Sequence, residues 1–181
     1  MSEQPSRTAL VVVADAAERA VAPWRRLHNR NAVERRIPAH VTILFPLVPA
    51  AVVDDGLLAQ LRVLFAPLAP FAYELATVES FPGVVWLAPQ PSAPFHALIA
   101  RTRAAFPDHP PYDDPALEPV PHCTIGVEGD PVGLEAMLDE VRAGLGPNLP
   151  ISCEADSAWL LEEGGDGTWS RRASFPFEGG S

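Results

Sequence analysis

The sequence predicts a two-lobed α+β protein, and three observations support this fold class. Apolar residues make up 48% of the 181 residues, which is enough to build a sizeable core. Strand-like and helix-like segments follow one another along the chain. Two short segments, residues 38–42 and 120–124, resemble each other and head the same order of elements. We therefore expect two βαββ-type lobes related by a pseudo-twofold axis, with antiparallel-rich sheets facing a central cleft and helices on the outside.

The first half of the chain has the signals of four strands and two helices. A continuous apolar run over residues 8–14 is typical of a buried strand. Asp15 can cap a helix over 16–28, in which Pro23 predicts a kink or a break. The polar, basic residues that follow predict a connection over 29–37. The remaining elements are a strand through 40–45, a helix from Asp54 or Asp55 to about residue 66, and a hairpin over 71–87 with a Pro82-Gly83 turn.

The second half continues with the same kinds of element. Ser92 can cap a helix that runs to about residue 106. A loop rich in proline and aspartate, over 107–119, leads directly into the second of the two similar segments. The later elements are a strand that carries residues 122–124, a helix over 132–145, a strand over 151–161, a Gly-rich turn over 162–167 and a last strand over 168–177.

Each of the two similar segments places a proline just before a His-x-Thr triplet on a predicted strand. Alternate residues of a strand share a face and lie roughly 6.5 Å apart along it. The histidine and threonine of one triplet therefore point the same way, whereas Val41 and Cys123 point into the core. We interpret the two strands as meeting at one phosphate. The four side chains expected to line this cleft are His40, Thr42, His122 and Thr124.

The elements that follow the two triplets suggest an internal duplication. A helix, a strand, a tight turn and a second strand follow each triplet, and Trp86 lies 46 residues after His40. Trp169 lies 47 residues after His122. Such self-similarity carries more weight than a single motif. We expect one domain over residues 1–181, built from interleaved lobes with a first triplet unit at about 38–88 and a second at about 120–177.

The composition limits the partners that this chain can have. The net charge is −10, which argues against long DNA or RNA, because such binding needs many contacts between basic residues and phosphates. Arg35 and Arg36 reverse the charge locally before the first triplet. Two cysteines do not make a disulfide framework, and no Cys/His spacing suggests a metal site. No stretch approaches the ~20 apolar residues that span a bilayer. We expect a soluble, cytoplasmic protein, a monomer by default, without membrane contact.

The two proline–His-x-Thr segments, with the apolar strand residues behind them, resemble the 2H phosphoesterase superfamily. This group includes 2′-5′ RNA ligase-like proteins and cyclic phosphodiesterases. A lone His-x-Thr is a weak pattern, but two of them, 82 residues apart and each after a proline, are a specific one. The resemblance covers nearly the whole chain. It implies a bilobal α+β fold, no metal or other cofactor, and reaction at a cyclic or 2′-linked phosphodiester.

The resemblance also assigns roles to the four triplet residues. His40 and His122 would be the catalytic base and acid, because an ordinary imidazole pKa of about 6.5 allows one copy to be neutral and another charged. Thr42 and Thr124 would donate hydrogen bonds to the non-bridging phosphate oxygens. Which histidine is the base stays open. Each threonine also has a structural interpretation, since threonine is favoured in strands.

Three further residues are candidates for substrate binding. Arg36 has the charge to bind a phosphate, Phe45 follows the first triplet, and Tyr112 lies in the long loop before the second triplet. Each has an ordinary alternative. Arg36 fits a solvated charge, Phe45 fits the core, and Tyr112 fits an exposed loop aromatic.

The function expected from the sequence is a metal-independent phosphoesterase that hydrolyses a 2′,3′-cyclic phosphate or a 2′-5′ phosphodiester of RNA ends or small nucleotides. One alternative is a nucleotide-binding module without turnover. Another is an RNA ligase that joins a 2′,3′-cyclic end to a 5′-hydroxyl. The acidic composition speaks against long RNA and so against the second alternative.

Overall fold

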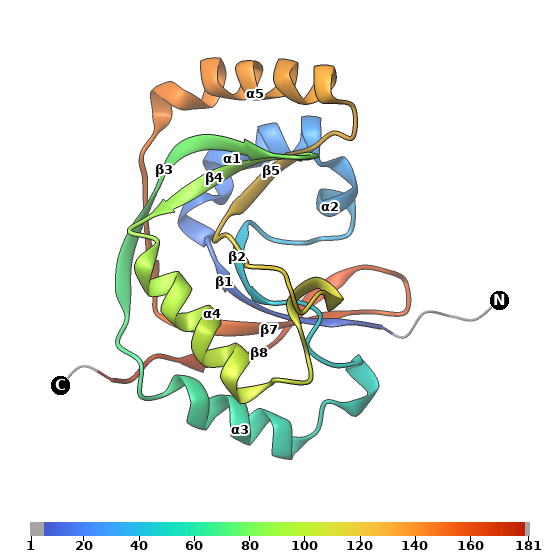
Figure 1. Cartoon of the computed structure of the whole chain (residues 1–181), viewed down its shortest axis with the longest axis vertical. Helices are drawn as coiled ribbons and strands as arrows, with labels where there is room; N and C mark the ends of the chain where they lie inside the picture. The colour runs from blue at the N-terminus through green and yellow to red at the C-terminus, as the bar shows by residue number, and fades with distance from the viewer. Residues whose placement is uncertain (1–5, 180–181) are drawn as a thin grey trace.

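A computed structural model describes residues 6–179, which form an α+β fold with two four-stranded antiparallel sheets (Figure 1). The strands are β1 (Thr8–Val13), β2 (His40–Leu44), β3 (Phe71–Phe81), β4 (Val84–Gln90), β5 (Cys123–Val127), β6 (Ile151–Ala155), β7 (Ser157–Glu163) and β8 (Trp169–Pro176). The α-helices in this range are α1 (Asp15–His28), α2 (Arg30–Glu34), α3 (Asp55–Phe65), α4 (Ala93–Ala105) and α5 (Pro131–Leu145). Short 3₁₀ turns occupy Ala50–Val52, Pro111–Asp113 and Gly146–Asn148.

The order of strands in the sheets places the two triplet strands in equivalent positions. One sheet has the order β2-β1-β7-β8, and the other has the order β5-β4-β3-β6. Each triplet strand, β2 or β5, is therefore an edge strand. Each is also reached by a crossover helix from the strand beside it, α1 in one case and α4 in the other. The edge strands β2 and β5 contact each other, so the two sheets meet where the triplets lie.

The predicted triplet units at 38–88 and 120–177 each contribute strands to both sheets. The hairpin β3–β4 pairs with β5 of the later unit, and the hairpin β7–β8 pairs with β1, next to β2 of the earlier unit. Each triplet strand thus completes the sheet built on the other unit's hairpin. The two halves are intertwined rather than placed side by side.

Of the three helix caps predicted from the sequence, that of Asp54 is observed, whereas Asp15 is the first residue of α1 and α1 has no side-chain cap. The Asp54 carboxylate accepts a hydrogen bond of 2.8 Å from the Leu57 amide at the start of α3, which satisfies one of the free amides of the first turn. The Asp130 carboxylate does the same for the Gly133 amide at the start of α5, also at 2.8 Å. Ser92 precedes α4 as predicted but makes no capping bond through its side chain.

Three other predictions about local structure were wrong. Pro23 does not break the first helix, since α1 is continuous and packing of its buried face outweighs the one amide that proline lacks. The connection over 29–37 contains the short helix α2. The strand predicted over 151–161 is two strands, because Asp156 separates β6, which pairs with β3, from β7, which pairs with β1.

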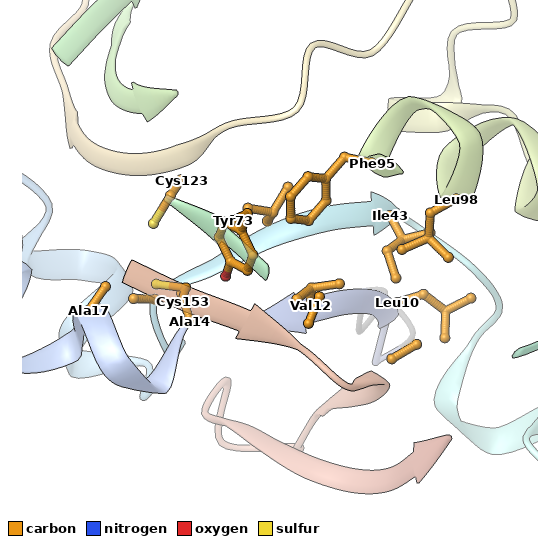
Figure 2. Packing of buried hydrophobic residues seen from close by; sticks show 14 of the residues in the cluster. Leu10, Val12, Ala14, Ala17, Ile43, Tyr73, Phe95, Leu98, Cys123 and Cys153 are labelled. Atoms are coloured by element: carbon orange, nitrogen blue, oxygen red, sulfur yellow. The ribbon is translucent and has the colours of Figure 1, made fainter. Parts of the chain in front are cut away.

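One hydrophobic core extends across both sheets (Figure 2). Tyr73 and Cys153 from one sheet face Leu10 and Val12 from the other, and Phe95 of α4 lies beside Tyr73. Helix α1 packs on β5 and β6, α5 packs on β3 and β4, α3 packs on β8, and α4 packs on β2. Figure 1 shows α5 and α3 at opposite ends of the molecule. The shared core fixes the position of one triplet strand relative to the other.

The contact between α1 and α5 leads to a test of stability. A Cβ atom added at Gly144 of α5 would lie 2.2 Å from Cη2 of Trp24 on α1. We expect Gly144→Ala to lower the free energy of unfolding by about 1–3 kcal/mol in urea denaturation, because the ring or the helix must shift. Gly146→Ala is the matched control, since nothing lies within 4 Å of its Cβ position. Equal stability of the two variants would contradict the close packing of α1 on α5.

Candidate active site

The first triplet lies on β2, where the side chains alternate between core and open face. Val41 is fully buried and Ile43 is 2% exposed, whereas His40 and Thr42 keep part of their surface open. This alternation follows from the pleat of the strand. The prediction that Val41 points into the core is confirmed. Thr42 and the residues after it form one wall of a cavity described below.

The second triplet repeats this arrangement at the start of β5. The strand begins at Cys123, one residue later than predicted, so that His122 lies just before it. Cys123 is fully buried, as predicted, and Thr124 is partly open. Burial raises the pKa of the Cys123 thiol to about 12, so this side chain is a neutral core group.

Both histidines are held by the same hydrogen bond. Nδ1 of His40 lies 2.7 Å from the carbonyl oxygen of Pro38, and Nδ1 of His122 lies 2.6 Å from the carbonyl oxygen of Val120. A carbonyl only accepts, so Nδ1 donates and carries the proton of the neutral ring. Nε2 of each neutral imidazole is then the nitrogen with a free lone pair. Each ring can therefore accept a proton at Nε2 when neutral and donate it from Nε2 when protonated.

The surroundings favour the neutral form of both rings. Burial lowers the pKa of His40 to about 4, and the carbonyl of Pro38 opposes this only in part. The charges of Arg25 and of a protonated His122 lower it further. Burial also lowers the pKa of His122, against the effect of the Val120 carbonyl. Without an anion in the cleft, both histidines are neutral at pH 7.

An ion pair on α1, between a buried arginine and a partly exposed glutamate, supports the backbone before the first triplet, and the sequence analysis did not identify it. Arg25, only 3% exposed, donates a 2.6 Å hydrogen bond to the carbonyl of Ile37 and pairs with Glu18 at 3.2 Å. Glu18 accepts a 2.8 Å bond from the amide of Ala39. Both bonds fix the backbone just before His40. The signal available in the sequence was two opposite charges seven residues apart on one helical face.

The ring of His122 is also fixed by aromatic neighbours. Phe81 meets it edge-on with ring centroids 5.1 Å apart, and Trp86 does so at 6.0 Å. These rings come from the β3–β4 hairpin, whose strand β4 pairs with β5. The conformation of His122 therefore depends on the shared sheet as well as on its bond to Val120.

A cavity of about 590 Å³ opens beside the two triplets. Its polar lining includes Thr42, Thr124 and His122, and its walls are otherwise mainly apolar. The walls come from β2, from the β3–β4 turn and from the segment over 111–120. His40 is not among the lining residues, but it is near enough to His122 for a charge on one ring to lower the pKa of the other.

The structure places two of the three predicted substrate-binding residues in this cavity. Phe45 lines it, with its ring edge-on to Tyr112 at 6.0 Å and near Trp169 at 6.1 Å. Tyr112 lines it too, and 43% of its surface is exposed. Arg36 is exposed and does not line the cavity. Its charge acts on Asp166 in the β7–β8 turn.

The loop before the second triplet is bound to the strand after the first. The amide of Tyr112 donates a 2.6 Å hydrogen bond to the carbonyl of Phe45. Tyr112 and Asp113 both have positive φ, at 53° and 59°, a conformation that costs free energy for residues other than glycine. This strained turn places the ring of Tyr112 beside that of Phe45, with ring centroids 6.0 Å apart.

Two kinds of feature were not found in residues 6–179. No three side chains of the His, Cys, Asp and Glu types lie together in a way that could hold a metal ion. In the same part of the chain, no helix has both the length and the apolar character needed to cross a bilayer.

Comparison with known proteins identifies the family. No curated protein matches the chain. LigT of E. coli complexed with 3′-AMP shares 16% identity and a TM-score of 0.61, over 96% of this chain and 99% of that one. TT0787 of Thermus thermophilus shares 18% identity and a TM-score of 0.61, over 97% and 100%. These structures show a common fold. The model of the 2′-5′ RNA ligase superfamily matches residues 13–167, so the chain belongs to that superfamily.

Proposed function

We propose that this protein is a metal-independent phosphoesterase that hydrolyses a 2′,3′-cyclic phosphate or a 2′-5′ phosphodiester. One observation carries the proposal. Two imidazoles sit on contacting edge strands, each with Nδ1 bound to a carbonyl and Nε2 free, and each two residues before a threonine. This arrangement supplies both proton transfers that the reaction needs. Membership of the 2′-5′ RNA ligase superfamily, and the solved complexes of LigT with 3′-AMP and with phosphate, support it.

Hydrolysis of a cyclic phosphate assigns one step to each histidine. Nε2 of one neutral imidazole removes a proton from water as the water oxygen bonds to phosphorus. The bond from phosphorus to one ribose oxygen breaks on the opposite side, and Nε2–H of the other, protonated imidazole donates a proton to that oxygen. The hydroxyls of Thr42 and Thr124 donate hydrogen bonds to the non-bridging oxygens, where negative charge builds up. The product is a phosphomonoester with a free neighbouring hydroxyl.

The charge of the substrate explains how one histidine becomes the acid. A bound phosphodiester places a negative charge beside both rings, and an opposite charge raises the pKa of an imidazole. The substrate therefore promotes protonation of one ring while the other stays neutral. The two rings have matching hydrogen bonds, so the assignment of acid and base can exchange when the reaction runs in reverse.

Substitution of either histidine tests the proposal. We expect His40→Ala and His122→Ala each to lower kcat/KM for a nucleoside 2′,3′-cyclic phosphate by about 10²–10⁴, because each removes one proton transfer. The assay follows formation of the nucleoside monophosphate in the presence of EDTA. His96→Ala is the matched control, since His96 is an exposed histidine on α4 outside the cavity. Full activity in either site variant, or loss of wild-type activity in EDTA, would rule the proposal out.

The pH dependence of the reaction offers a second test. The active form has one neutral and one protonated imidazole, so its fraction is greatest between the two pKa values of the free enzyme. Burial lowers the pKa of His40 to about 4 and that of His122 below 6.5. We expect kcat/KM to peak below pH 6.5 and to fall as the pH rises above it. The profile of kcat should lie at higher pH, because bound substrate raises both pKa values.

This pH test is a comparison of two profiles measured on one substrate. A maximum of kcat/KM above pH 7 would contradict the lowered pKa values of the empty site. Coincident profiles for kcat and kcat/KM would contradict the role given to the substrate charge. His96→Ala again serves as the control and should reproduce both wild-type profiles.

A further inference from the structure

We infer that the cavity accepts a free mononucleotide with a single phosphate and discriminates against substrates that carry a second phosphate, the ends of RNA included. The inference rests on the proposed function and narrows its substrate class. It follows from the charges, the shape and the wall chemistry of the cavity, each of which is argued in turn below.

The cavity has almost no positive charge to offer. Among the described residues that line it there is no arginine, and the whole chain contains no lysine. Its one formally charged lining residue is acidic, Glu118, whose side chain is 91% exposed. One phosphate meets the histidine and the two threonine hydroxyls of the triplets. A second phosphate elsewhere in the cavity would find no cation among the lining residues, and the charged side chain there is the carboxylate of Glu118.

The arginines that contact lining residues of the cavity already bind carboxylates. Arg103 pairs with Glu118 itself, with Nη1 and Oε2 3.7 Å apart. Arg7 stacks on the ring of Phe45 at 5.3 Å, but its guanidinium binds Glu163, which Arg35 binds as well. A second phosphate would have to compete with these carboxylates for an arginine.

The rest of the cavity suits a base and a ribose. A volume of about 590 Å³ falls in the range of roughly 300–1,000 Å³ that is usual for pockets that enclose a small ligand. Apart from the triplet groups, the walls are mainly apolar, with Phe45, Phe81, Val84 and Leu117 among them. A nucleobase gains from contact with apolar and aromatic walls, whereas further phosphates gain nothing from them. The cavity thus matches one nucleotide.

Binding measurements test this inference independently of turnover. We expect calorimetry to show that adenosine 3′,5′-bisphosphate binds about threefold to tenfold more weakly than adenosine 3′-monophosphate, because the added phosphate meets only a negative charge. Higher salt should reduce this difference in affinity, because it screens the repulsion between the added phosphate and the carboxylate. The difference in affinity between the two nucleotides should be smaller in Glu118→Gln than in the wild type. It should be unchanged in Glu135→Gln, which is a matched substitution on the exposed surface of α5.

Turnover gives the matching kinetic comparison. Adenosine 2′,3′-cyclic phosphate should have a higher kcat/KM than the same compound with a 5′-phosphate, by a similar factor. Equal or tighter binding of the bisphosphate, or no binding of the monophosphate, would overturn the inference. Preferential binding of the monophosphate without hydrolysis of any cyclic phosphate would overturn the proposed function and leave the inference standing.

Discussion

The pleat of two short edge strands is the constraint on which the site depends. In β2 and β5 one face is buried and the other stays open. Because alternate residues of a strand share a face, the three residues of a triplet are enough to place one side chain in the core and two on the open face. Burial of Val41 and Cys123 fixes which way each strand faces. A shift of one residue in either register would send a histidine into the core and a hydrophobic side chain into the cavity.

The two histidines make the same hydrogen bond to the backbone, but different side chains surround them. Each ring binds the carbonyl two residues earlier, which is a local consequence of the strand entrance. Around His40 the second layer is ionic, because Glu18 and Arg25 bind the preceding backbone. Around His122 it is aromatic, with Phe81 and Trp86. The two halves reach the same side-chain arrangement by different physical means, so their histidines have unequal surroundings despite equal hydrogen bonds.

Local features of the fold could be predicted from the sequence, whereas its strand pairing could not. The spacing of apolar residues indicated most helices and strands and the direction in which the triplet side chains point. Both features depend on neighbours within a few residues of the chain. The pairing of β1 with β7 joins segments some 150 residues apart, such as Thr8 with Glu162, and no local pattern encodes it. The role of Arg25 escaped notice because its partner carbonyl, that of Ile37, lies in the connection between α2 and β2, whose course the sequence does not reveal. Tyr112 was a candidate for substrate binding only from its place in the loop, because its packing against Phe45 depends on a turn with positive φ.

The intertwined sheets have a consequence for synthesis of the chain on the ribosome. Strands β1 and β2 are made early, but the next strand in their sheet, β7, spans Ser157–Glu163. Until that segment emerges, strand β1, whose six residues are all buried in the folded protein, has one unpaired edge and an incomplete core, a condition that favours aggregation and slow folding. The other sheet is also incomplete at this stage, because β3 lacks its partner β6 until residues 151–155 have been made. Nascent chains of this fold therefore have a long interval in which protection by chaperones matters, and the candidate site forms only at its end.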